Sequence, residues 1–133
     1  MDGESAPGYL TDISKCVPYA TYQDGTLTFS FGVMPEDGMS LNEVNGGPEW
    51  INNLDDITTV VFDPMFKYAR LSTCLGAFAK CKNLTEIRGI EYLNTEKVVD
   101  MRGMFAYCES LTMLDLTHFN TVQVKDMGLM FYQ

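Results

Sequence analysis

Apolar residues recur at a regular interval along the C-terminal half of the chain. Five positions of the stretch that begins at Val98 return one interval later, in the same order. The pairs are Val98 and Val124, Asp100 and Asp126, Met101 and Met127, Met104 and Met130, and Phe105 and Phe131. A repeat period in the twenties is typical of a stacked solenoid, in which no single unit buries its apolar face alone.

Fainter copies of the same pattern precede this pair, at an interval that is longer by a single residue. Leu84, Ile87 and Cys81 stand one such interval before Leu111, Leu114 and Cys108. Ile57 and Val60 stand a further interval before Leu84 and Ile87. The pattern therefore predicts three repeats, at 57–83, 84–110 and 111–133, of which the third is incomplete.

One half of each repeat has the alternation of a β-strand. In the segment Leu111 to Leu116, Leu114 and Leu116 alternate with Met113 and Asp115, and Val60 and Phe62 alternate in the same way in the first repeat. In the second repeat Ile87 and Ile90 are three residues apart, which predicts a bulge near Gly89. Stacked repeats would align these strands in a parallel sheet, with ladders of equivalent residues through the core.

The other half of each repeat has helical spacing. Met101, Met104, Phe105 and Cys108 would share one face of a short helix, and Met127 and Met130 repeat that face. Equivalent residues begin these segments. They are Thr73, Asp100 and Asp126. Their side chains can cap exposed N–H groups at a helix start, which we favour over a carboxylate pair for acid–base work or cation binding.

The segment before the repeats predicts a β-hairpin cap. Runs of β-prone residues at 19–22 and 26–31 flank Asp24-Gly25, a dipeptide that suits a tight hairpin turn. Trp50 follows a loop rich in Gly and Pro, where it could shield the first repeat. We interpret residues 1–56 as a flexible lead-in followed by this N-terminal cap.

Composition narrows the classes of function. The chain has 133 residues, of which 46% are apolar, and this length is enough for one hydrophobic core. Its formal net charge of −9 would repel nucleic acid. No apolar run reaches the roughly 18 residues of a membrane helix, so we expect no membrane insertion by this segment. The first residues do not have the pattern of a secretion leader, so either the chain is cytosolic or a leader has been removed from it, and the start at Met1 fits a trimmed mature protein.

The cysteines and the single histidine do not form a metal motif. Cys16, Cys74, Cys81 and Cys108 include no C-x-x-C pair, and we predict no metal or cofactor. Cys81 and Cys108 occupy equivalent positions, so they should be neighbours in the stack, either as core thiols, which we favour, or as a disulfide. Asp55 and Asp56 do not have the further oxygen ligands that calcium needs.

A catalytic site is not expected. Cys108, Asp115 and His118 are the thiol, carboxylate and imidazole that come nearest to the set of groups in a site for nucleophilic catalysis. Cys108 should point into the core while Asp115 points outward, so the three groups would not converge. We therefore predict a protein that is not an enzyme.

The repeat resembles that of the BspA-like bacterial surface leucine-rich-repeat proteins. The resemblance is carried by Met104-Phe105, Leu114-Asp115-Leu116, Phe119-Asn120-Thr121, Asp126-Met127 and Met130-Phe131 at their spacing, and it covers about residues 19–133. It implies a right-handed leucine-rich-repeat solenoid, with a parallel β-sheet on one side and short helices on the other. It also implies a location outside the cell or on the bacterial surface, and adhesion or protein binding as the role.

The outward side of the predicted sheet is the candidate binding face. Its residues would be Thr59, Val61, Glu86, Arg88, Tyr92, Met113, Asp115 and His118. The partner would be a protein or another macromolecule at a cell surface. Alternatively, the face is only solvated and the repeats are a spacer or assembly element, which associates end to end through the open third repeat near Phe131.

Overall fold

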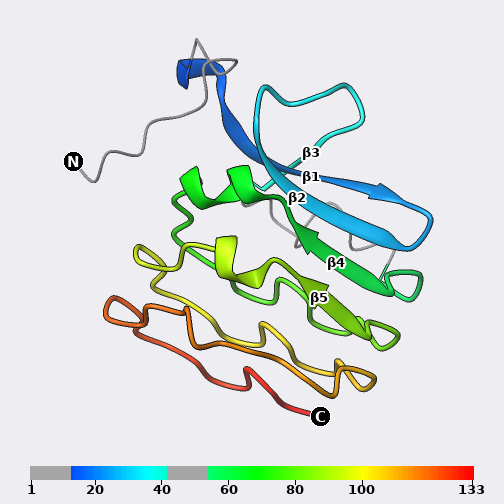
Figure 1. Cartoon of the computed structure of the whole chain (residues 1–133). Helices are drawn as coiled ribbons and strands as arrows, with labels where there is room; N and C mark the ends of the chain where they lie inside the picture. The colour runs from blue at the N-terminus through cyan, green and yellow to red at the C-terminus, as the bar shows by residue number, and fades with distance from the viewer. Residues whose placement is uncertain (1–12, 42–53) are drawn as a thin grey trace.

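The fold is built on one mixed sheet of five strands (Figure 1). The computed structural model describes residues 13–41 and 54–133. The strands lie in the order β3-β1-β2-β4-β5. The elements are η1 (Ile13–Lys15), β1 (Val17–Gln23), β2 (Thr26–Gly32), β3 (Met39–Ser40), β4 (Thr59–Phe62), η3 (Pro64–Tyr68), β5 (Glu86–Arg88) and η4 (Ile90–Tyr92). The predicted lead-in and Trp50 lie outside the described residues, and the proposed division at residue 56 stays a prediction.

The first two long strands form the hairpin that the sequence predicts. β1 and β2 pair antiparallel, and Asp24 and Gly25 make the turn with φ values of 49° and 85°. Leu27 and Phe29 are buried while Thr26 and Thr28 are not, as the alternation requires. The carbonyl oxygen of Gly25 also accepts from the N–H groups at residues 58 and 59, at 2.8 and 3.2 Å, which ties the turn to the chain that follows.

Parallel pairing joins the hairpin to the first two repeats. β2 pairs with β4, which places Leu27 beside Val60 and Phe29 beside Phe62. The rings of Phe29 and Phe62 stack with their centroids 5.0 Å apart. β4 then pairs with β5, again in parallel. The hairpin and the repeats therefore share one sheet and one core.

The predicted right-handed leucine-rich-repeat solenoid with short helices is wrong. The sheet is mixed, and residues 13–41 and 54–133 contain no α-helix. The segment expected to be helical, from Met101 to Cys108, is a series of tight turns with bonds such as Met104 N–H to the Met101 carbonyl, three residues back. Gly103 and Tyr107 have φ values of 61° and 59°, and left-handed residues at this spacing prevent a helix.

The predicted strand at 111–116 is also absent. Leu111, Leu114 and Leu116 pack only partly buried against the core, whereas Ile57 and Leu84 in the preceding repeats are fully buried. The predicted bulge near Gly89 is instead the end of β5. Gly89 has a φ of 74°, and a Cβ there would overlap the carbonyl oxygen of Phe62.

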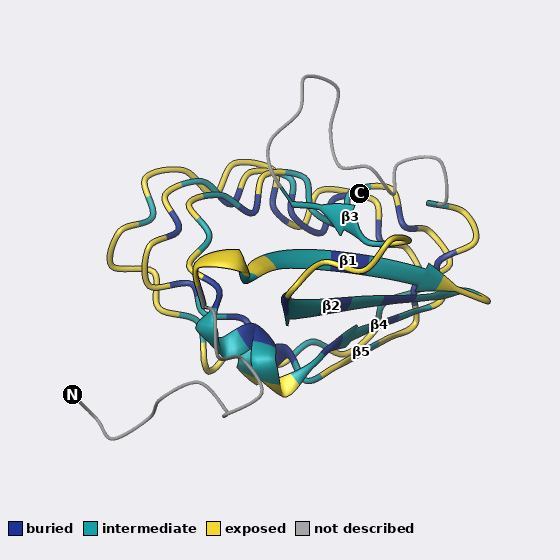
Figure 2. Cartoon of the chain, turned by 90° about the horizontal axis from the view of Figure 1, so that it is seen from above, coloured by how far each residue is buried: buried dark blue, intermediate teal, exposed yellow. Residues whose placement is uncertain are grey.

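Equivalent segments of the three repeats lie side by side (Figure 1). We call residues 73–80, 100–107 and 126–133 the first, second and third arms. The first arm donates four N–H bonds of 2.7–2.9 Å to carbonyl oxygens of the second arm, and the second donates four of 2.7–3.0 Å to the third. Seen from above, the repeats superpose beneath the hairpin, with buried residues toward the inside (Figure 2).

This register produces the predicted columns of like residues. The Phe78 and Phe105 rings stack at 5.7 Å, and so do Phe105 and Phe131. The predicted capping residues also act alike. The side chains of Thr73, Asp100 and Asp126 each accept a backbone N–H bond from two residues on, at 3.0, 3.0 and 2.8 Å. The capped groups belong to turns and not to helices.

We expect Gly103→Leu to destabilise the protein by about 1–2 kcal/mol, the cost of a left-handed conformation for a residue with a Cβ. The nearest atom to such a Cβ is the Ala106 Cβ at 4.0 Å, so the cost would be conformational and not steric. Gly103→Asn should lose less, because Asn tolerates this region. The free energies of unfolding, measured in urea, show whether Gly103→Leu loses more stability than Gly103→Asn. Equal losses in the two variants would contradict a conformational cause.

Candidate functional site

The candidate site is the side of the sheet that faces away from the core. Residues alternate across a strand, so every second side chain of β1, β2, β4 and β5 points outward. We call these residues, apart from the two at the ends of β1, the outer face. They are Tyr19, Thr21, Thr26, Thr28, Ser30, Thr59, Val61, Glu86 and Arg88.

The strand register arranges the outer face in rows. Thr21 is beside Thr28, Thr28 is beside Val61, and Val61 is beside Arg88. In the next row Thr26 is beside Thr59, and Thr59 is beside Glu86. The parallel pairing of β2 with β4 is what brings residues from the hairpin and the repeats together.

The centre of the outer face is rich in uncharged hydroxyl groups. Their side chains make no hydrogen bond or other polar interaction with any residue of 13–41 or 54–133. These residues are Thr21, Thr26, Thr28, Ser30 and Thr59, and all five are half-buried. Hydroxyl groups both donate and accept, so this array can bind a partner of either polarity.

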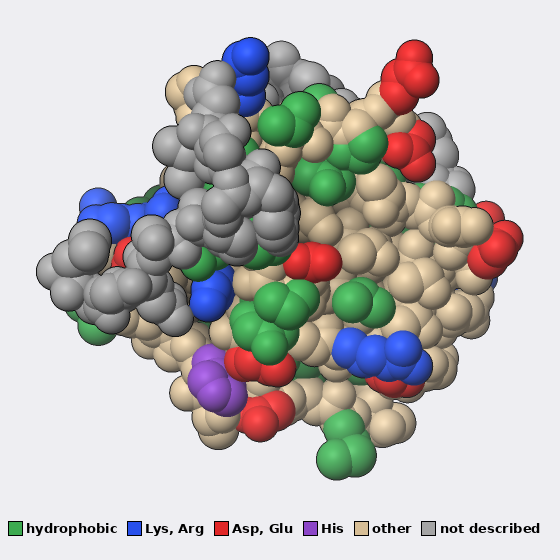
Figure 3. Space-filling model, turned by 45° about the horizontal axis from the view of Figure 1, so that its top comes forward, with side chains coloured by type: hydrophobic (Ala, Val, Ile, Leu, Met, Phe, Trp, Pro, Cys, Tyr) green, Lys and Arg blue, Asp and Glu red, His purple; other side chains and the backbone are tan. Residues whose placement is uncertain are grey.

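The charges on the outer face neutralise each other. Arg88 donates from Nε to Oε2 of Glu86 and from Nη2 to Oε1, the latter at 3.3 Å. The hydrogen bond from Arg88 holds the pKa of the Glu86 carboxyl below its usual value. In Figure 3 charged side chains are scattered over this side of the molecule and form no large patch of one sign. On the outer face itself the charged residues are Glu86 and Arg88, whose charges are opposite.

The predicted binding residues divide into two groups. Thr59, Val61, Glu86 and Arg88 lie together on neighbouring strands. Tyr92 belongs to η4, where it is half-buried and packs against the core. The remaining three follow the sheet, in a segment without strand structure. They are Met113, Asp115 and His118.

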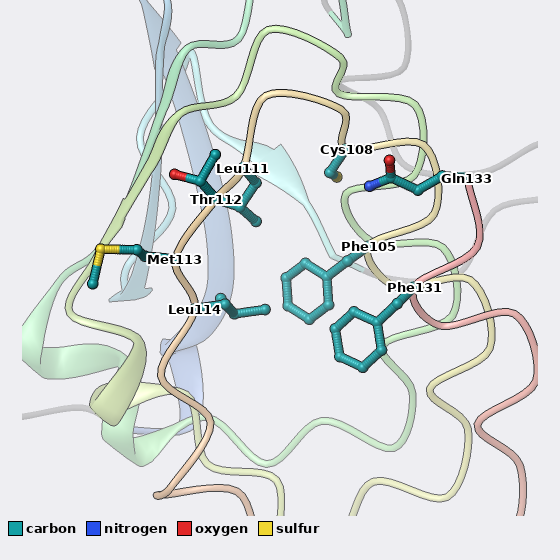
Figure 4. Close-up of a pocket in the computed structure, with 8 residues that line it drawn as sticks. All are labelled: Phe105, Cys108, Leu111, Thr112, Met113, Leu114, Phe131 and Gln133. Atoms are coloured by element: carbon teal, nitrogen blue, oxygen red, sulfur yellow. The ribbon is translucent and has the colours of Figure 1, made fainter.

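Met113, Asp115 and His118 are all exposed. Met113 is 85% exposed and points away from the core, opposite to Leu114 (Figure 4). Asp115 accepts bonds from the N–H and Oγ1 of Thr117, at 3.0 and 2.7 Å. These bonds, and to a smaller degree the charge of His118, lower the pKa of the Asp115 carboxyl.

The hairpin residues of the outer face were missed by the sequence analysis. The alternation of Thr26, Thr28 and Ser30 with apolar residues did signal an outward polar row. Nothing in that alternation indicates that β2 pairs with β4, which is a contact between distant parts of the chain. The row was therefore not connected with the repeats.

The thiol, carboxylate and imidazole considered for nucleophilic chemistry do not converge. Cys108 is buried, and its Sγ donates to the Phe78 carbonyl at 3.0 Å. Asp115 lies outside the core and is bonded to Thr117. Among the described residues no group of three or more His, Cys, Asp or Glu could hold a metal ion. Asp55 is exposed, with Lys82 Nζ 3.7 Å from its carboxylate.

A hollow of about 120 Å³ opens beside the third arm (Figure 4). Phe105, Leu114 and Phe131 point into it. The complete lining is Phe105, Cys108, Leu111, Thr112, Met113, Leu114, Phe131 and Gln133. Phe131, the last ring of the column, is 57% exposed as a residue.

The chain belongs to a known protein family. Residues 52–133 match the family described as "Mycoplasma protein of unknown function, DUF285". The matched region contains the three repeats, the third arm and the repeat side of the outer face. Comparison with curated proteins and with solved structures finds no match. The resemblance to BspA-like proteins stays a prediction, because these findings do not bear on it.

No helix in the described parts of the chain has the length and apolar character that crossing a membrane requires. This finding concerns helices of residues 13–41 and 54–133.

We expect Cys74, Cys81 and Cys108 to resist alkylation in the folded protein. None of the four cysteines is in a disulfide. Burial raises the pKa of Cys74 and Cys81 to about 12 and that of Cys108 to about 11. Since the thiolate is the reacting form, iodoacetamide at pH 8 should modify only the partly exposed Cys16, and all four in urea.

Mass spectrometry of peptides from the alkylated protein identifies the modified residues. Reaction of Cys81 or Cys108 at the rate of Cys16 without denaturant would contradict their place in the core.

Proposed function

We propose that the chain is a non-catalytic binding module that mediates adhesion or protein–protein interaction through the outer face. The observation that supports it best is the array of half-buried hydroxyl groups with no intramolecular hydrogen bond to a described residue. Val61 and Tyr19 add apolar surface to the array. A surface that combines hydroxyls with apolar groups suits the mixed chemistry of a non-obligate protein interface.

The electrostatics of the outer face fit a macromolecular partner without strong charge. Glu86 and Arg88 are bonded to each other, so a partner that covers them would not leave either charge buried without its counter-charge. Arg88 also remains 65% exposed in its side chain, and arginine is enriched at the centres of interfaces. A protein or another macromolecule at a cell surface is our proposed partner.

The proposed location is outside the cell or on the bacterial surface. It is supported by the resemblance of the repeat to bacterial surface proteins and by the acidic composition, which would keep the module soluble there.

A second candidate function is a structural spacer or assembly element. It is favoured by the exposed apolar residues at the end of the third arm, which include Leu129, Phe131 and Tyr132 at 68%, 57% and 50% exposure. In that case the outer face is only solvated. Contacts between copies would form at the third arm instead.

We expect Val61→Asp to reduce adhesion at least tenfold, because it replaces an apolar side chain in the centre of the outer face with a carboxylate that a partner would have to desolvate. Beads coated with the protein are applied to an epithelial cell monolayer, and the retained fraction is counted after washing. Val122→Asp is the matched control, since Val122 is 86% exposed on a turn outside the outer face. Thermal unfolding verifies that both variants fold. Equal retention of the two would overturn the binding proposal.

The spacer alternative makes a different prediction. Phe131→Asp should abolish self-association in sedimentation velocity, since it removes the last ring of the column, whereas Val61→Asp and Val122→Asp should leave it unchanged. A wild-type protein that stays monomeric at millimolar concentration would exclude assembly through this end.

A further inference from the structure

Two rows of side chains occupy the centre of the outer face. In the first row Thr28 of β2 lies between Thr21 of β1 and Val61 of β4. In the second row Thr59 of β4 lies beside Thr26 of β2. Neighbouring strands are about 4.8 Å apart, so the two rows gather four threonine hydroxyl groups within reach of one extended ligand.

The composition of these rows favours a carbohydrate over a protein surface as the partner. Most of the binding energy at a protein interface comes from a few residues, among which Ser, Thr and Val are under-represented. Val61 is the one apolar side chain in the two rows. The threonine hydroxyl groups can both donate and accept, and they bond to no described residue. A ligand that is itself dense in hydroxyl groups can satisfy more of them than a protein surface can.

The charges of the outer face favour an uncharged carbohydrate. Arg88 and Glu86 are hydrogen-bonded to each other, so neither charge is left for an anionic ligand to pair with. The chain as a whole has a formal net charge of −9, which repels anionic groups. A sulfated or carboxylated sugar chain should therefore bind less tightly than a neutral one, which loses no charge hydration on contact.

Tyr19 adds an aromatic ring at one side of the hydroxyl groups. It lies on β1 between Ser30 of β2 and Ser40 of β3, and it is half-buried. An aromatic side chain of this kind offers an apolar ring face and a polar tip. The C–H groups on one face of a sugar ring can stack on such a side chain, while the sugar hydroxyl groups bond to the polar residues around it.

We propose that the outer face binds an uncharged carbohydrate chain on a cell surface. The sugar hydroxyl groups exchange hydrogen bonds with Thr21, Thr26, Thr28 and Thr59, and a sugar ring stacks against Tyr19. This role rests on the adhesive function proposed above, for which it supplies the chemistry of the partner.

Sodium periodate distinguishes a carbohydrate partner from a protein partner, because it cleaves the bond between neighbouring carbons that both carry hydroxyl groups. A fixed epithelial monolayer is treated with periodate and then with borohydride, which reduces the aldehydes formed, before the coated beads are applied. The control monolayer receives periodate that ethylene glycol has already consumed. We expect periodate to reduce the retained fraction of beads at least tenfold.

The double variant Thr28→Val/Thr59→Val tests the hydroxyl groups themselves. Valine keeps the shape and the β-propensity of threonine but forms no side-chain hydrogen bond, so retention on the untreated monolayer should fall at least fivefold. Thr121→Val is the matched control, since Thr121 is exposed at the start of a turn outside the outer face, and it should be retained as the wild type is. Thermal unfolding verifies that both variants fold.

Neuraminidase tests the charge of the ligand, because it removes the anionic sialic acid residues from cell-surface sugar chains. Retention should be unchanged or higher after this treatment. A loss of retention would overturn the uncharged ligand.

Retention that survives periodate would overturn the carbohydrate as partner, and so would equal retention of the double variant and Thr121→Val. In either case the adhesive function would still stand if Val61→Asp lost retention on the untreated monolayer. Equal retention of Val61→Asp and Val122→Asp there would instead remove the adhesive function, so the two failures are distinguishable.

Discussion

The main-chain hydrogen bonds between the arms hold the repeated part of the molecule in register. Eight N–H groups of the first two arms each bond to a carbonyl oxygen of the next arm, at 3.0 Å or less. Because backbone groups that leave water must find partners, these bonds fix which residue lies over which. The stacked rings of Phe78, Phe105 and Phe131 follow from that register.

The same bonding gives the molecule two chemically different surfaces. On the sheet side, alternation turns hydroxyl-bearing residues outward while Leu27 and Val60 fill the core. On the arm side, the carbonyl oxygens of Met127 and Leu129 accept hydrogen bonds within local turns, from the N–H groups of Met130 and Tyr132. One surface is thus neutral and able to both donate and accept, and the other chiefly donates.

The failure of the helical prediction has a local cause. Apolar residues three and four positions apart occur on one face of a helix, but a chain of tight turns places residues three apart on one side as well. Lys80 and Tyr107 take φ values of 66° and 59° although neither is glycine. The backbone accepts these costs because the bonds to the next arm depend on them. Periodicity in a single sequence does not distinguish the two structures.

The sequence by itself determined what is local or periodic. The Asp24-Gly25 turn, the capping role of Thr73, Asp100 and Asp126, and the column of phenylalanine rings could all be predicted, because each depends on residue type at a fixed spacing. Only the tertiary structure decided the pairing of β2 with β4 and the absence of a strand at 111–116. These depend on which distant segment satisfies each backbone group, and that choice leaves no pattern in the residues themselves.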